Sequence, residues 1–330
     1  MRRRTKNAIR AAVVLLVFLV VFVYIKFFNG TFIYISTGLS KNQLLKVDGS
    51  ATDVMEADIL LSDAKTQYEN VFGTDVWNQT MDGVNFDDYA KDQVKTKLSR
   101  VKCMNIYAKK NGVVLSRAQK ENVSNAVDEF YSKLSDDQIN KLNITKEKLS
   151  DMFTEFAIAQ SLYEDMTASM DTEVSADDAR VIKIQYICSD DETKINEALG
   201  KLNSGESFYS VAKEYADSSE NETELSRGKM EESFENAAFD LKSGETSSVI
   251  KSNDKYYIIK CTSDNEKAKT EANKNVLVEK NKLNYFNDKF NSYEAGKYVE
   301  FNSKLWSKRT TASAESLPVN FEETFNSYFK

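Results

Sequence analysis

Two strand-like runs in the middle of the chain, with short helical patterns between them, constrain the fold more than any other feature. Residues 181–188 (VIKIQYIC) alternate in the manner of a strand, and residues 256–261 (YYIIKC) form a second strand-like run. The pattern predicts helices at residues 192–202, 208–216 and 231–241, and a further strand at residues 247–251 that turns at residues 252–254. This stretch therefore predicts a small antiparallel sheet with helices packed around it.

Short motifs follow one another in a fixed order within this stretch. Ala212-Lys213-Glu214-Tyr215 precedes Met230, and Met230 precedes a Phe-Glu-Asn-Ala-Ala-Phe run at residues 234–239 and Leu-Lys-Ser-Gly-Glu at residues 241–245. In this order, residues 180–263 resemble the parvulin-type peptidyl-prolyl isomerase domain. The resemblance covers about a quarter of the chain and is specific in its second half.

The resemblance implies a proline-binding slot. Prolyl isomerisation needs no nucleophile, because its barrier of about 20 kcal/mol comes from amide resonance and a site works by binding the twisted amide best. In parvulins a methionine and a phenylalanine line the slot for the proline ring, and these match Met230 and Phe234. Phe239, which follows in the same motif, is a third substrate-binding candidate.

The polar half of the site departs from the family pattern. The two parvulin histidines match Tyr186 and Tyr257, and the cysteine or aspartate of the family matches Ser218 or its neighbour Asp217. The glycine-rich stretch before the methionine is shortened to residues 224–228. By this resemblance the catalytic candidates are Tyr186, Ser218 and Tyr257. Two interpretations stay open: the tyrosines form a working isomerase floor, or they pack in a domain that has lost catalysis but still binds peptide.

Composition excludes several classes of function. The chain has no histidine, which removes Ser-His-Asp and Cys-His catalysis, histidine-ligated zinc and imidazole switches. The net charge of −7, with basic residues scattered among acidic ones, argues against nucleic acid as the partner. No metal or cofactor site is predicted, and three widely spaced cysteines indicate neither a disulfide framework nor zinc: Cys103, Cys188 and Cys261.

The amino end predicts a membrane anchor. Residues 1–10 are basic without an acidic residue, and residues 11–28 are apolar except for Lys26, whose stem can reach the headgroups. As a helix, residues 11–28 rise about 27 Å, close to the thickness of the hydrocarbon core. The basic flank is expected in the cytoplasm and the bulk of the chain outside it. The alternative is a cleaved signal peptide, although residues 29–38 offer no Ala-x-Ala site.

Helical patterns surround the middle stretch. Residues 40–175 predict a hairpin at residues 43–54 and amphipathic helices, of which the clearest are residues 56–72 and 86–110 and those opened by Ser116, Ser135 and Thr145. Residues 265–330 predict a long charged helix, a strand at residues 297–301 and a docked end marked by Phe321, Phe325 and Phe329. The predicted fold class is α+β.

This layout resembles the PrsA/SurA group of extracytoplasmic foldases. The resemblance implies a helical chaperone module at residues 40–175, an inserted parvulin-like domain at residues 180–263, and a carboxyl-terminal segment, residues 265–330, that packs back onto the module. The implied function is an anchored foldase that binds X-Pro segments of unfolded secreted chains, with weak or absent isomerase activity. A fully active isomerase and a non-catalytic envelope adaptor are the alternatives, and a homodimer stays open.

Overall fold

The computed structural model describes residues 32–81, 83–217 and 222–329, and they form two compact units. One unit is residues 170–284, and the other joins residues 32–169 to residues 285–329. The predicted anchor at residues 11–28 lies outside the described residues. Among the helices that are described, none has both the length and the apolar character needed to cross a membrane.

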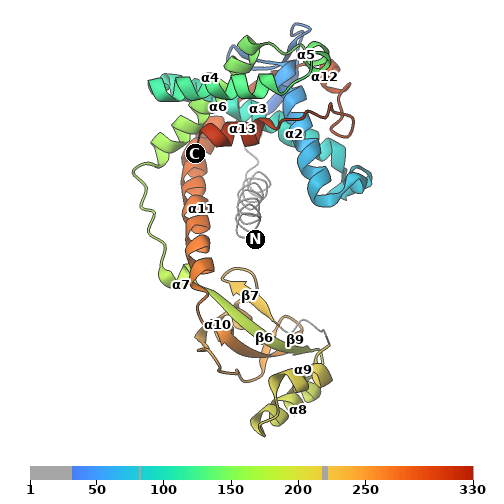
Figure 1. Cartoon of the computed structure of the whole chain (residues 1–330), viewed down its shortest axis with the longest axis vertical. Helices are drawn as coiled ribbons and strands as arrows, with labels where there is room; N and C mark the ends of the chain where they lie inside the picture. The colour runs from blue at the N-terminus through green and yellow to red at the C-terminus, as the bar shows by residue number, and fades with distance from the viewer. Residues whose placement is uncertain (1–31, 82, 218–221, 330) are drawn as a thin grey trace. The chain divides into compact units, whose positions relative to one another are not determined.

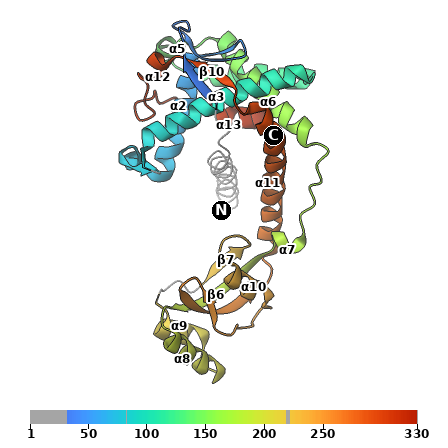
Figure 2. The same cartoon turned by 180° about the vertical axis from the view of Figure 1, so that it is seen from behind.

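The unit of residues 170–284 is built on a four-stranded antiparallel sheet in the order β7-β6-β9-β8. Helix α10 packs on one face of the sheet, whereas α8 and α9 pack on the other (Figures 1 and 2). The strands are β6 Val181–Ser189, β7 Thr223–Ser226, β8 Ile250–Ser252 and β9 Lys255–Ser263. The helices are α7 Ala176–Ala179, α8 Glu192–Asn203, α9 Phe208–Tyr215, α10 Glu232–Asp240 and the first part of α11 Lys267–Glu294.

The sheet confirms the predicted α+β class, with two corrections to its strands. Residues 223–226 form the edge strand β7 beside β6, a strand that the sequence did not predict. The strand predicted at residues 247–251 begins only at Ile250, because the Ser247 hydroxyl accepts the Ile259 N–H at 2.9 Å and replaces a ladder bond. The pairing to β9 is therefore irregular before Ile250.

The second unit is mainly helical. Side-chain caps start its helices where the sequence predicts them: Ser116 and Ser135 form capping boxes with Gln119 and Gln138. The helices are α2 Val54–Phe72, the 3₁₀ turn η1 Thr74–Asn78, α3 Phe86–Lys110, α4 Arg117–Ser132, α5 Asp136–Leu142, α6 Lys146–Thr167, α12 Ser303–Trp306, α13 Phe321–Tyr328 and the end of α11. A hairpin of β4 Thr80–Met81 and β5 Val84–Asn85, which the sequence did not predict, precedes α3.

A second four-stranded sheet joins the two ends of this unit, in the order β1-β10-β2-β3. Figure 2 shows β10 beside the strands from the beginning of the unit. The predicted hairpin is confirmed as β2 Gln43–Val47 and β3 Ser50–Asp53, with positive φ angles at Asp48 and Gly49 in its turn. Strand β1, Ile33–Ser36, was not predicted; it pairs in parallel with β10, Tyr298–Phe301, from the far end of the chain.

The phenylalanines at the carboxyl end lie in the core of this unit. The Phe321 ring centroid lies 4.5 Å from that of Phe153 and 4.8 Å from that of Phe156, both on α6. Phe325 and Phe329 are also buried, with their rings stacked 4.6 Å apart. Residues 285–329 therefore complete the same hydrophobic core that residues 32–169 begin.

Candidate active site

Two of the predicted catalytic residues lie side by side on one face of the sheet in residues 170–284. Tyr186 on β6 and Tyr257 on β9 have ring centroids 6.1 Å apart. Both rings meet Phe234 of α10 edge to face, at 6.0 Å for Tyr186 and 5.1 Å for Tyr257. Such edge-to-face contacts favour a fixed arrangement of rings. The three side chains form an aromatic floor in which Phe234 is buried and the two tyrosines are half-buried.

Tyr257 also lies next to a thiol. Cys188 is its direct partner in the β6–β9 pairing, so the two side chains are on the same face of the sheet. Burial raises the pKa of Tyr257 to about 12, and the neighbouring Cys188 and Tyr186 act in the same direction. The phenol of Tyr257 therefore keeps its proton at neutral pH and can both donate and accept a hydrogen bond.

A buried glutamate, the residue that follows Phe234 on α10, holds the backbone around Met230. The Glu235 carboxylate on α10 accepts the backbone N–H groups of Gly228 at 2.9 Å, Lys229 at 2.6 Å and Met230 at 2.7 Å. Desolvation opposes the charge, but these backbone hydrogen bonds outweigh it and lower the pKa of Glu235. Met230 is thereby fixed with 40% of its surface exposed, as an apolar side chain in contact with solvent.

The remaining described site candidates, Phe239 and Asp217, do not contribute an exposed side chain to the aromatic floor. Phe239 is 2% exposed, and the Arg227 guanidinium lies 4.3 Å from its ring centroid, so it packs in the interior. Ser218 lies outside the described residues. Its neighbour Asp217 donates its N–H to the Cys188 carbonyl, whereas its carboxylate pairs with Lys194 at 2.7 Å. The Asp217 carboxylate is therefore engaged in a surface ion pair.

Sequence reasoning missed two residues of this site, Glu235 and Cys188. A glutamate on the apolar face of a short helix, just after Phe234, was the available signal for Glu235. Gly228, with a φ of 80°, lets the chain turn so that three successive N–H groups converge on that carboxylate. For Cys188 the signal was its position two residues after Tyr186 on a strand, which places both side chains on one face.

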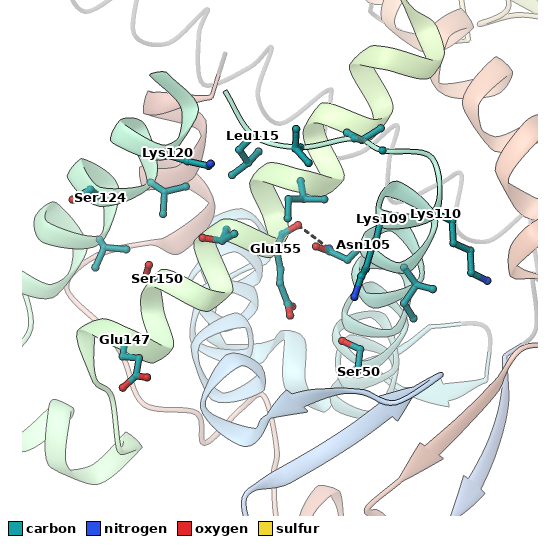
Figure 3. Close-up of a pocket in the computed structure, with 18 of the residues that line it drawn as sticks. Ser50, Asn105, Lys109, Lys110, Leu115, Lys120, Ser124, Glu147, Ser150 and Glu155 are labelled. Atoms are coloured by element: carbon teal, nitrogen blue, oxygen red, sulfur yellow. Dashed lines mark hydrogen bonds between the residues drawn. The ribbon is translucent and has the colours of Figure 1, made fainter. Parts of the chain in front are cut away.

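The helical unit contains a second candidate site, an open groove of about 1650 Å³. Figure 3 shows it between α4 and α6 on one side and α3 on the other, with the β2–β3 hairpin beneath. Its walls are apolar where helices face one another and carry lysines at the rim. The apolar lining includes Ile106, Val113, Val114, Leu115, Val123, Val127 and Ile158, and the rim lysines are Lys109, Lys110, Lys120 and Lys146.

Charged and polar groups form the base of this groove. Lys102 is buried and its ammonium lies 2.6 Å from the Glu155 carboxylate, which lines the groove. Asn105 donates to the Glu155 backbone carbonyl at 2.9 Å, the contact drawn in Figure 3. Glu56 lies 3.7 Å from the Lys102 ammonium on the interior side. The base of the groove is therefore a fixed ion-paired network rather than an open charged pocket.

The residues that the structure describes contain no candidate metal site. No group of three or more carboxylate or thiol side chains comes together there in a manner that could hold an ion. The thiols of Cys103, Cys188 and Cys261 are free and buried. The chemistry available at both candidate sites is hydrogen bonding, aromatic contact and ion pairing.

Comparison with known families identifies the segment that contains the aromatic floor. Residues 184–263 match the Rotamase family, described as the PPIC-type PPIASE domain. The matched segment contains β6 from Ile184 onward, the helices α8, α9 and α10, and the strands β7, β8 and β9. This part of the chain is a parvulin-type rotamase domain.

Relatives are found over a longer part of the chain. It is 28% identical over 222 residues to the foldase protein PrsA of Caldanaerobacter subterraneus subsp. tengcongensis, covering 65% of this chain and 71% of that protein. It is 32% identical over 154 residues to foldase protein PrsA 4 of Bacillus cereus, covering 44% of this chain and 55% of that protein. Over these lengths the chain is similar to PrsA foldases, and residues 184–263 form its PPIC-type rotamase domain.

Solved structures of the same kind are similar to this chain at low identity. The peptidylprolyl isomerase PrsA from Bacillus cereus shares 20% identity at a TM-score of 0.39, covering 88% of this chain and 100% of that one. A SurA-like chaperone structure from Campylobacter jejuni shares 14% identity at a TM-score of 0.29, covering 79% and 99%.

Proposed function

We propose that this chain is a membrane-anchored extracytoplasmic foldase that binds X-Pro segments of translocated, partly folded chains. The observation that carries the proposal is the start of α10, where Glu235 binds the Met230 loop and the preceding residue, Phe234, contacts the rings of Tyr186 and Tyr257. Flat aromatic rings and an exposed methionine suit the apolar proline ring. The two foldase relatives named above agree with this function.

The polar half of the floor determines how much catalysis accompanies binding. Isomerisation is accelerated only if contacts to the twisted amide are stronger than contacts to the planar one. The protonated hydroxyl of Tyr257 can donate to the rotating carbonyl, and Tyr186 and Ser218 are the other candidates for polar contact. Tyr186 and Tyr257 stand at the positions that match the two parvulin histidines, so phenols take the place of imidazoles. We therefore propose weak or absent peptidyl-prolyl isomerase activity.

The groove in the helical unit is the proposed site for the rest of the client. Its apolar walls and lysine rim, over a fixed ion-paired base, can hold extended unfolded segments without selecting one sequence. In this proposal residues 40–175 form the helical chaperone module that contains the groove, and residues 265–330 complete that module. The clients are unfolded secreted polypeptides, and neither a cofactor nor nucleic acid takes part.

Anchoring and orientation follow from the first residues of the sequence. We propose that residues 11–28 span the membrane once, with residues 1–10 in the cytoplasm and the bulk of the chain outside it. A foldase tethered in this way meets each chain as it leaves the translocation machinery.

Aggregation of an unfolded secreted protein tests the foldase directly. The full chain in detergent is expected to suppress aggregation in proportion to its amount, because it holds the client rather than turning it over. The variant Val114→Asp, at an exposed apolar residue of the groove, is expected to reduce this suppression, whereas Glu121→Asp on the outer face of α4 is not. Suppression that is absent, or unchanged in Val114→Asp, would contradict the holding role.

A fully active isomerase is the second candidate, and the geometry of the tyrosines favours it. Both rings are locked against Phe234, so their hydroxyls are positioned without further ordering. Turnover of a proline peptide that disappears in Tyr257→Phe while peptide binding persists would support this candidate. A domain that binds but shows no turnover and no effect on aggregation would instead be an adaptor.

A further inference from the structure

Strand β1 presents apolar side chains on both of its faces. Phe32, just before it, and Tyr34 point inward: the Tyr34 hydroxyl lies 3.1 Å from the Ser99 hydroxyl, and its ring centroid lies 5.6 Å from that of Phe301. Alternation in a strand then turns Ile33 and Ile35 outward, where each is 45% exposed. A strand with one face in water normally carries polar residues on that face, so these two isoleucines require an explanation.

The pairing of β1 with β10 extends this apolar face. Ile33 lies opposite Tyr298, and Tyr298 is 61% exposed. Ile35 lies opposite Glu300, which pairs with Lys46 of β2 at 3.0 Å. Side chains of paired residues share a face of the sheet, so the three exposed apolar side chains are contiguous and the Glu300–Lys46 pair borders them. We call Ile33, Ile35 and Tyr298 the outer patch.

The position of the outer patch in the chain limits what can cover it. The apolar run ends at Phe28, and Ile33 follows five residues later. Five residues span at most about 18 Å when fully extended. If residues 11–28 cross the bilayer, as proposed above, Ile33 is held within that distance of the hydrocarbon edge, and the headgroup region itself is about 5–8 Å thick.

We infer that the outer patch rests on the lipid surface beside the anchor, with Ile33, Ile35 and Tyr298 in the headgroup region. Tyrosine is enriched at that depth because its ring is apolar and its hydroxyl is wet, and aliphatic side chains add affinity by burying their surface. The Glu300–Lys46 pair lies on the side of the patch nearer water. This inference rests on the proposed anchor and adds the orientation of the sheet relative to the membrane.

A second copy of the chain is the competing occupant, and the size of the patch argues against it. A stable interface between two proteins buries about 800 Å² on each partner, which corresponds to 20–30 residues. The outer patch has three apolar side chains and is bordered by an ion pair. A lipid surface needs no complementary partner shape, and the proposed anchor would place one at this end of the chain.

Quenching by nitroxide lipids tests the inference on the full chain in phosphatidylcholine–phosphatidylglycerol vesicles. The native thiols are buried, so an environment-sensitive fluorophore can be attached selectively to Ile35→Cys. Ile35 points outward, and the inner row of Phe32 and Tyr34 is left intact. The matched control is Val114→Cys, an exposed valine of the same unit that is 79% exposed and remote in sequence from the anchor.

We expect a lipid with a nitroxide near the headgroup to quench the label at residue 35 at least threefold more than the label at residue 114. Equal quenching on vesicles that carry the chain would overturn the lipid contact and leave the anchor intact. A chain that fails to float with the vesicles would contradict the anchor, and the lipid contact with it. Disulfide-linked dimers of the unlabelled Ile35→Cys chain after addition of an oxidant, with no quenching of the labelled chain, would replace the lipid by a second copy.

Discussion

The two units place their charges in different ways. In residues 170–284 the ion pairs lie at the surface: Lys194 pairs with Asp217 and Lys183 with Glu222, both between exposed or half-exposed side chains. In the helical unit several titratable side chains are buried. Burial raises the pKa of Asp63 to about 8 and that of Glu56 to about 7.

Buried polar side chains hold together segments that are far apart in the chain. The Asp63 carboxyl group on α2 accepts the N–H groups of Phe321 and Glu322, each at 3.1 Å, at the start of α13. Arg100 on α3 pairs with the buried Glu294 near the end of α11 at 3.0 Å. A discontinuous unit thus uses buried polar contacts to fix how its segments meet, whereas the continuous rotamase domain relies on local strand pairing. The helical unit should therefore depend more on pH and on its last residues.

The largest expected effect is on the core that the carboxyl end completes. Phe321→Ala is expected to destabilise the helical unit by about 3–5 kcal/mol, because it removes a fully buried ring that contacts Phe153 and Phe156. Urea unfolding, monitored separately for the two units by hydrogen exchange, measures the change. The rotamase domain should be unaffected.

Phe72→Ala is the control for this change, since Phe72 lies on the same unit but is 60% exposed. Its cost should be below about 1 kcal/mol. Equal losses in the two variants, or an equal loss in both units, would contradict the division of the chain drawn above.

A smaller effect is expected from Glu235→Ala in the rotamase domain. The change leaves three backbone N–H groups without their acceptor and should destabilise the domain by about 2 kcal/mol. Because Met230 is then no longer fixed, binding of an X-Pro peptide should weaken about tenfold in a fluorescence titration. Glu232→Ala, three residues earlier on the exposed side of α10, should change neither quantity; weakening by both variants would point to a general effect of charge.

The pH dependence of stability should come from the helical unit. Glu56 has a pKa of about 7 in the folded chain against 4.5 in the unfolded one, so the folded state binds its proton more tightly. This tighter proton binding stabilises the folded state fully below pH 4.5, and the stabilisation is lost as the pH rises through 7. Glu56→Gln keeps the capping geometry and should stabilise this unit by about 1–2 kcal/mol at pH 8, with little change at pH 5. Unfolding curves at both pH values measure the difference; a variant that is destabilised at pH 8 would contradict this account.

The smallest effect is expected at the aromatic floor. With a pKa of about 12, the Tyr257 phenol stays protonated from pH 6 to 9, and the chain has no imidazole that titrates in this range. Any isomerase activity should therefore vary less than about twofold across that range after correction for unfolding. A bell-shaped profile with an inflection near neutral pH would show that another group participates.

The sequence predicted local structure well where one segment contains its own signals. The helix predicted at residues 86–110 is confirmed as α3, because Asn85 caps its start by accepting the Asp87 N–H and its apolar side chains recur at helical spacing. The β2–β3 hairpin is confirmed for the same reason, since Asp48 and Gly49 supply the turn. The order of motifs from Ala212 to Glu245 is likewise sufficient to indicate the rotamase domain.

Pairing between distant segments could not be predicted in the same way. Strand β1 has only four residues and no alternation of polarity, and its partner β10 lies more than 250 residues later, at Tyr298–Phe301. The Glu235 contacts depend on a turn in which three N–H groups converge, and only the folded loop reveals this. Ser218, Tyr186 and Tyr257 keep their catalytic roles as predictions, because geometry can place a hydroxyl but turnover must be measured.

The most direct test of the central proposal is a comparison of two peptides that differ only in X-Pro against X-Ala, titrated into the full chain by fluorescence anisotropy. The account predicts that the proline peptide binds at least tenfold more tightly, and that Met230→Ala, which changes an exposed side chain and leaves the buried Phe234 in place, reduces this preference. An isomerisation assay on the same samples would then show whether binding is accompanied by turnover. Equal binding of the two peptides by the folded chain would contradict the proposal that this face recognises proline.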